Sequence, residues 1–165
     1  MKKQKGYTTP VGFVILAIVL TILSAFAISR YMKFRSETNT ATTWYLKSSI
    51  GCAAELVHYT AKAQIAAGAI SRPGHSNGVT VKIDTNATVT TACGNTIKGD
   101  CLYPDSVDAG IVAALKSLVP DNYTIGNSTS RTSIQVSKSG SPANCFVTYD
   151  IRSGTPFITA TTSGC

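Results

Sequence analysis

The sequence predicts an α+β fold in which a long N-terminal helix packs on a small antiparallel sheet of four strands. An uncharged run, Pro10–Ile28, is followed by sequence without proline as far as Gly68, which is typical of one long helix. Short alternating segments separated by turn residues fill the C-terminal part. Because 165 residues suffice for one hydrophobic core and hardly for two, we expect a single domain with an N-terminal appendage.

The composition indicates an extracytoplasmic protein. Charged residues make up 14% of the chain, compared with about 25% in ordinary soluble domains, and Ser, Thr, Asn and Gly fill the surface-like stretches instead. The formal net charge of +7 includes Lys2, Lys3 and Lys5, which precede the uncharged run. Without these three lysines, the chain has twelve basic and eight acidic residues. This mild excess is weak evidence for nucleic-acid binding.

The uncharged run has the length of a membrane span. Nineteen residues of helix, Pro10–Ile28, extend about 28 Å, and a hydrocarbon core is about 30 Å thick. The leading lysines predict that the N-terminus stays in the cytoplasm. A secretory signal peptide cleaved after Ala27, in the small-residue motif Ala25–Ala27, is the alternative. We favour a retained helix, because helix-compatible sequence continues beyond Ala27.

Two apolar stripes mark the second half of the predicted long helix. At 100° per residue, an inner stripe and an outer stripe lie more than 90° apart. The inner stripe contains Leu46, Ile50, Ala53, Val57 and Ala61, and the outer stripe contains Tyr45, Cys52, Leu56, Tyr59 and Ala63. The two stripes either form one broad core face or serve two partners. We expect the inner stripe to face the sheet and Tyr45, Leu56 and Tyr59 to face an external partner, because a phenol keeps a polar contact at an interface.

The remaining elements follow from turn chemistry. Short strands are expected within His75–Asn95, and a helix from Pro104 to Pro120 with Ile111 and Leu115 on its inner face. Four strand-like runs follow, near 123–126, 132–137, 145–151 and 157–162. The links between them are short, so an antiparallel meander is the simplest connection.

The first 37 residues resemble the N-terminus of type IV pilins and of the wider class of prepilin-peptidase substrates. The resemblance is carried by the basic leader ending in Gly6, by the aromatic Tyr7 followed by Thr8, by the uncharged helix and by the segment AFAISRYMKFRSE. The order of long helix, variable loop, four-stranded sheet and C-terminal cysteine pair is also similar. The resemblance implies that a prepilin peptidase cuts between Gly6 and Tyr7, that Tyr7 is methylated, and that the helix packs with its copies in a filament.

On this resemblance, residues 1–6 are a leader, 7–34 the transmembrane or filament-core half of the helix, and 35–165 a globular head with a loop region at 69–121 and a sheet at 122–165. The chain would lie in the inner membrane before assembly and afterwards in a homo-oligomeric, helical filament on the cell surface. Most such pilins carry a glutamate where this chain has Val11. Members without it include tip subunits, so a minor or tip pilin or a secretion-system pseudopilin is the alternative to a major subunit.

Five cysteines in this layout indicate an oxidising compartment. Cys145 and Cys165 bracket the last predicted hairpin, and a disulfide between them would contribute about 3 kcal/mol on the chain-entropy model. Cys93 and Cys101 would close a small loop, which leaves Cys52 as an unpaired, buried helix thiol. Alternatively, Cys52 pairs with Cys93 or Cys101 and ties the loop to the helix.

The sequence favours neither an enzyme nor a metal or cofactor site. GxSxG, HExxH and phosphate-loop motifs are absent, and His58 and His75 lack ligand spacing. Asn86, preceded by Asp84, is a weak glycosylation candidate. A DNA-uptake pilin, and hence nucleic acid as a partner, would require that several basic side chains cluster on the head. The candidates are Lys82, Lys98, Lys116, Arg131 and Lys138.

Overall fold

The computed structural model describes residues 10–71, 79–83, 88–91, 102–116, 123–130, 133–151 and 154–165. The chain divides into two compact units, Met1–Thr38 and Asn39–Cys165. One helix, α1 (Pro10–Ala66), contributes to both units. The sequence predicts a different boundary, between residues 34 and 35, which separates the part of the helix buried in a membrane or filament from the head. This boundary stays a prediction.

Helix α1 ends where its sequence predicts. Its described part starts at Pro10. At its C-terminal end, Gly68 has a positive φ of 70°. The N–H of Ala69 donates to the carbonyl of Gln64 at 2.9 Å and that of Gly68 to the carbonyl of Ile65 at 3.0 Å. This pair of bonds is the Schellman motif, so glycine at position 68 ends the helix.

The first unit of the chain is exposed throughout its described part. Every side chain from Pro10 to Thr38 is exposed, including large apolar ones such as Phe13 at 69% and Leu23 at 59%. By length and composition, α1 can cross a membrane through this apolar part.

The second unit has an antiparallel sheet in which each strand pairs with its successor. The strands are β3 (Tyr123–Ser130), β4 (Ser133–Lys138), β5 (Phe146–Asp150) and β6 (Phe157–Thr161). The predicted meander is therefore confirmed. Ile134 lies opposite Tyr149, and Val136 lies opposite Val147. All four are buried, so one face of the central strands is apolar.

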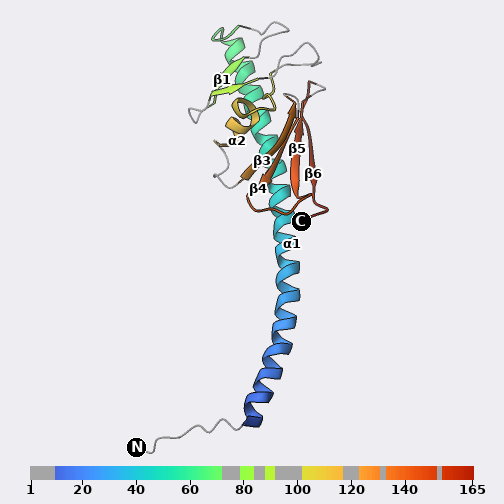
Figure 1. The fold of residues 1–165 in the computed structure, drawn as a ribbon. Coiled ribbons are helices and arrows are strands. Elements are labelled where there is room, and N and C mark those ends of the chain that lie inside the picture. The colour runs from blue at the N-terminus through green and yellow to red at the C-terminus, as the bar shows by residue number, and fades with distance from the viewer. Residues whose placement is uncertain are drawn as a thin grey trace, which may run out of the picture. The chain divides into compact units, whose positions relative to one another are not determined.

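The core of this unit lies between that sheet face and α1 (Figure 1). Ile50 and Val57 of α1 have no exposed surface and belong to the same cluster of buried residues as Val136 and Val147. The architecture is thus the α+β layout that the sequence predicts, a long helix together with an antiparallel four-stranded sheet.

The loop region contains a small hairpin and a short helical turn. Strands β1 (Thr80–Lys82) and β2 (Thr88–Thr90) pair antiparallel, and an isolated bridge joins Thr91 to Pro104. The prediction that a helix starts at Pro104 is wrong for residues 104–107. Instead, a π-type turn, η1 (Asp108–Val112), precedes a short α2 (Ala113–Lys116). Ile111 and Leu115 are buried, as expected for the inner face.

The late start of this helical segment has a local cause. Pro104 is engaged in the bridge to Thr91, and the N–H of Asp105 donates to the carbonyl of Thr90 at 2.9 Å. The N–H of Ile111 then donates to the carbonyl of Asp105 at 2.8 Å. These bonds hold Pro104 and Asp105 against the hairpin. Gly110, inside η1, departs from helical φ and ψ angles, so regular α-helix begins only at Ala113.

Candidate functional site

The part of α1 in the second unit has one fully buried face. The predicted inner stripe is confirmed: Leu46 is 4% exposed, and Ile50, Ala53, Val57 and Ala61 are 0% exposed. The first four belong to the core cluster shared with the sheet, and Ala61 packs with Val81 and Leu102 of the loop region. One stripe of small and branched aliphatic residues thus anchors both the sheet and the loop region on the helix.

The opposite face of the same helical part is open. Tyr45 is 60% exposed, Tyr59 64% and Leu56 38%, and Ala63 is also exposed. We call Tyr45, Leu56 and Tyr59 the outer face. The two stripes are therefore distinct surfaces of one helix, and the alternative of a single broad core face is wrong. What the outer face contacts in the cell stays a prediction.

Three residues on or near the stripes differ from what the stripes predict. Cys52 is a free thiol in the structure, but it is exposed and not buried, because it lies on the outer stripe with Leu56 and Tyr59. Conversely, Ala54 and His58 are buried at 0% and 5% exposure. The buried face is therefore wider, towards His58, than the five-residue stripe indicates.

His58 packs into an aromatic cluster. Its ring stacks on Tyr103 with a centroid distance of 4.1 Å and an interplanar angle of 7°, and it meets Tyr59 edge to face at 5.5 Å. Tyr103 donates a hydrogen bond to Glu55 at 3.4 Å. His58 thus has a structural role between α1 and the loop region.

A second set of buried polar groups lies where the loop region meets the sheet. Tyr149, at 0% exposure, donates a 2.8 Å hydrogen bond to the carbonyl of Pro104. Burial raises the pKa of Tyr149 well above its usual value, and the negative charge of Asp105 adds to this effect. Because the phenol stays neutral, it acts as a hydrogen-bond donor that fixes the loop and not as an acid or base at ordinary pH.

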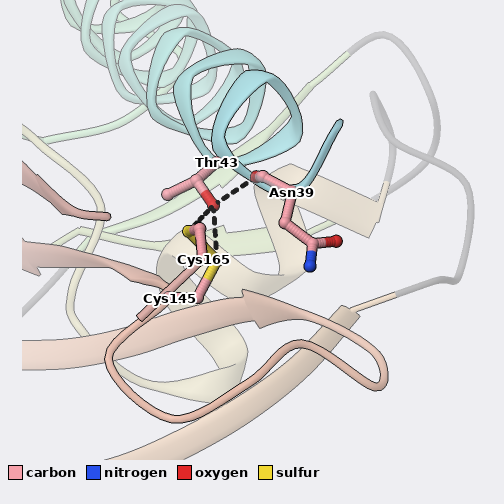
Figure 2. The surroundings of a disulfide bond; sticks show 4 residues. All are labelled: Asn39, Thr43, Cys145 and Cys165. Carbon is pink, nitrogen blue, oxygen red and sulfur yellow. Dashed lines mark hydrogen bonds between the residues drawn. A yellow bond between two sulfur atoms is a disulfide. The ribbon is translucent and has the colours of Figure 1, made fainter. Parts of the chain in front are cut away.

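The predicted disulfide between Cys145 and Cys165 is present, with 5.0 Å between the Cα atoms. Figure 2 shows it against α1, where Thr43 points at the sulfur atoms. The hydroxyl of Thr43 donates to the carbonyl of Asn39 at 2.9 Å. Its oxygen lies 3.3 Å from the sulfur of Cys145 and 3.6 Å from that of Cys165. The disulfide therefore packs on the helix as well as linking the two ends of the last hairpin.

The chain around this disulfide admits little extra volume. Gly164 donates from its N–H to the carbonyl of Asn144 at 3.0 Å, and a Cβ atom at Gly164 would overlap the carbonyl oxygen of Ala143. Asn144 itself has a φ of 59°, a conformation that asparagine tolerates better than most residues. The sequence alone drew attention to the cysteines, whereas these two neighbours were missed.

Several predicted site residues lie outside the described part of the chain. They are Gly6, Tyr7, Asn86, Cys93 and Cys101. Processing, glycosylation and the second cysteine pair accordingly stay predictions. Of the basic residues proposed as a cluster, Lys98 and Arg131 also lie outside it, while Lys82 and Lys116 are exposed. Val11 is 68% exposed on α1.

Within the described residues, no three His, Cys, Asp or Glu side chains come together as a metal site would require. The notable features are instead surfaces: an exposed apolar helix and an outer face with two tyrosines. No protein-family model, no curated protein and no solved structure matches this chain. Its function is therefore inferred from α1 and from the head that α1 anchors.

Proposed function

We propose that this chain is a structural subunit of a bacterial, type IV pilus-like surface filament and that it assembles through α1. One observation carries the proposal: a single helix presents a long exposed apolar segment, and further along it separates a buried face from an exposed face with aromatic residues. A helix of an ordinary globular protein buries its apolar side chains. On α1, Phe13, Leu23 and Phe26 are 59–70% exposed, so this surface needs lipid or other protein to cover it.

The physical mechanism is an exchange of apolar environments. Each large aliphatic or aromatic side chain gains about 1.5–3 kcal/mol when it leaves water, so the apolar segment of α1 is stable only in a bilayer or in a protein core. The bilayer stores the helix before assembly. In a filament, contacts with neighbouring helices replace contacts with lipid, and the helix never meets water.

The head has a complementary role in this mechanism. Its inner stripe is occupied by the sheet and the loop region, whereas Tyr45, Leu56 and Tyr59 are left for contact with neighbouring subunits. Tyrosine is favoured at such interfaces because it offers apolar area and a hydroxyl at low cost in side-chain entropy.

The processing of the N-terminus tests the proposal directly. We expect cleavage between Gly6 and Tyr7, because this site stands between the basic leader and the apolar helix. Intact mass and N-terminal sequencing of the protein from cells should show a chain that starts at Tyr7, with a mass increase for methylation. A chain that starts at Ile28 would mean cleavage as a signal peptide, and it would remove the apolar helix that the proposal needs.

Val11 favours a second candidate, a minor or tip pilin or a secretion-system pseudopilin. A glutamate at this position is thought to pair with the freed amino group of a neighbouring subunit in most pilins. Val11 offers no carboxylate, and an unpaired buried amine is costly. A subunit with no neighbour ahead of it avoids that cost. The number of copies in purified filaments separates this candidate from a major subunit.

A further inference from the structure

The segment of α1 directly after the uncharged run concentrates basic side chains. Arg30, Lys33 and Arg35 follow Ser29, with Glu37 as the one acidic residue among them. All of them are exposed, and the side chains of Lys33 and Glu37 are 70% and 65% exposed. We call Arg30–Glu37 the basic collar. The proposed function does not use these charges, because it concerns the apolar segment and the outer face of the head.

The position of the collar matches the edge of a bilayer. From Pro10 to Ser29 the helix carries no charge, and these residues extend about 30 Å at 1.5 Å per residue. A hydrocarbon core has the same thickness. When the apolar segment spans the core, Arg30 therefore lies at the boundary and Lys33 and Arg35 lie in the headgroup layer, where phosphate groups are found.

The charges of the collar surround the helix. At 3.6 residues per turn, Lys33 lies about 60° from Arg30 in one direction, and Arg35 lies about 140° from it in the other. A single protein partner would contact one side of the helix, whereas a lipid headgroup layer contacts all sides. Arg30, Lys33 and Arg35 outnumber Glu37, so the collar has a net positive charge. The ion pair between Lys33 and Glu37, at 3.9 Å, is exposed and contributes little free energy.

Aromatic side chains lie among these charges. Tyr31 is 65% exposed and Phe34 is 68% exposed, and both lie between Arg30 and Arg35 around the helix. Aromatic residues are enriched at membrane–water interfaces, and long basic side chains there lay their stems on the apolar region and extend their charges to the phosphates. Charge, length and aromatic content thus indicate the same surroundings for the collar.

We propose that the basic collar binds the headgroups of anionic phospholipids while α1 spans the membrane. The occupant is a lipid headgroup layer rich in phosphatidylglycerol or a similar anionic lipid. The inference rests on the proposed function in one respect, since it concerns the stage before assembly at which the bilayer stores α1. It adds a lipid specificity that the storage mechanism alone does not require.

The test uses the full chain reconstituted in phosphatidylcholine vesicles that contain a trace of spin-labelled phosphatidylglycerol or spin-labelled phosphatidylcholine. Electron paramagnetic resonance measures the fraction of each lipid held at the protein surface. We expect a preference for phosphatidylglycerol. In the variant Arg30→Gln/Lys33→Gln/Arg35→Gln this preference should fall about fivefold or more, because one basic residue near a membrane surface contributes about a fivefold change in association. High salt should weaken the preference of the natural chain.

The matched control removes three charges from the head. Lys82→Gln/Lys116→Gln/Lys138→Gln has the same net charge as the collar variant, and both variants keep the three leader lysines. It should retain the preference of the natural chain. Equal binding of both lipids by the natural chain, or equal losses in both variants, would overturn the inference. Because the measurement needs neither cleavage nor filaments, a chain that starts at Tyr7 but shows no lipid preference would leave the proposed function intact.

Discussion

Tyr149 illustrates at the scale of one residue how the head holds its loop region. The side chain comes from a central strand, and its hydroxyl reaches the carbonyl of Pro104. Pro104 is itself bridged to Thr91. The phenol therefore joins the sheet to the hairpin. Its neutral form is required, because burial and the nearby Asp105 both disfavour the phenolate, and they raise the pKa of Tyr149.

The raised pKa predicts how stability depends on pH. Below about pH 10 Tyr149 is neutral in both the folded and unfolded states, and its full contribution to the free energy of unfolding is present. Above that pH the unfolded chain releases the proton, while the folded protein keeps it until the pH reaches its raised pKa. The free energy of unfolding should therefore fall as pH rises, by about 1.4 kcal/mol per pH unit for this one group.

The variant Tyr149→Phe checks this expectation. It should be less stable by about 1–3 kcal/mol at neutral pH, because the buried carbonyl of Pro104 loses its donor. Above pH 10 its stability should decline less steeply than that of the natural chain. Thermal unfolding of the full chain in micelles, followed between pH 7 and 11, measures both effects. Parallel declines in the two proteins would contradict the assigned cause.

Single-residue detail was also where sequence reasoning was weakest. The spacing of Cys145 and Cys165 suggested a disulfide, and the structure has it. The contact of both sulfur atoms with Thr43 was not foreseen, because helical periodicity says nothing about which distant strand end meets the helix. The sequence predicts a buried Cys52, but the thiol is exposed, because it lies on the outer stripe with Leu56.

At the scale of elements, the local sequence pattern predicts well those elements whose hydrogen bonds stay within one helix or join strands that follow each other in the chain. The C-terminal end of α1 follows from Gly68, and the meander follows from short turns between strands. The helix expected from Pro104 fails in its first turn because the bonds of Asp105 to Thr90 and Ile111 compete with helical ones. A pairing with a strand fourteen or more residues away in sequence leaves no trace in the local periodicity.

Two glycines give a matched prediction for these elements. Gly51 lies inside α1, and an added Cβ would meet only Ile158, at an ordinary 3.8 Å. Gly110 lies in η1, and an added Cβ would overlap the backbone of Asp105. Gly51→Ala should therefore stabilise the head by about 0.5–1 kcal/mol through helix propensity. Gly110→Ala should destabilise it by about 1–3 kcal/mol through overpacking.

Thermal unfolding of both variants in micelles measures this difference, at about 4 °C per kcal/mol for a head of this size. Opposite signs for the same substitution would show that space at each glycine, and not the residue type, decides the effect. A loss of stability on Gly51→Ala would mean that Ile158 lies too close to α1 to accept a Cβ atom at position 51, contrary to the 3.8 Å contact expected.

At the scale of the whole molecule, the proposal separates folding from assembly on opposite faces of α1. Leu56 and Val57 are neighbours in sequence, yet Leu56 is 38% exposed and Val57 is 0% exposed. A charge at Val57 has to enter the core, which costs several kcal/mol. A charge at Leu56 remains at the surface of the subunit, but it would be trapped in a contact between subunits.

Leu56→Glu should therefore leave the thermal stability of the head nearly unchanged and abolish filaments in cells, whereas Val57→Glu should unfold the head. Stability is measured on the purified chain in micelles, and filaments are counted by electron microscopy of cells. Unfolding by Leu56→Glu would mean that this face belongs to the core, and filaments that persist in that variant would exclude the outer face from assembly.

The disulfide between Cys145 and Cys165 has a consequence for the timing of maturation. If the head is exported with α1 leading, as the proposal implies, Thr43 crosses the membrane first, Cys145 follows the whole of β4, and Cys165 crosses only after β6. Cys145 therefore spends an interval outside the membrane as a reactive thiol before its partner arrives. During that interval an oxidant could join it to Cys52, which is exposed. An oxidant slower than export, or an isomerase that repairs early mistakes, would therefore favour the correct pairing.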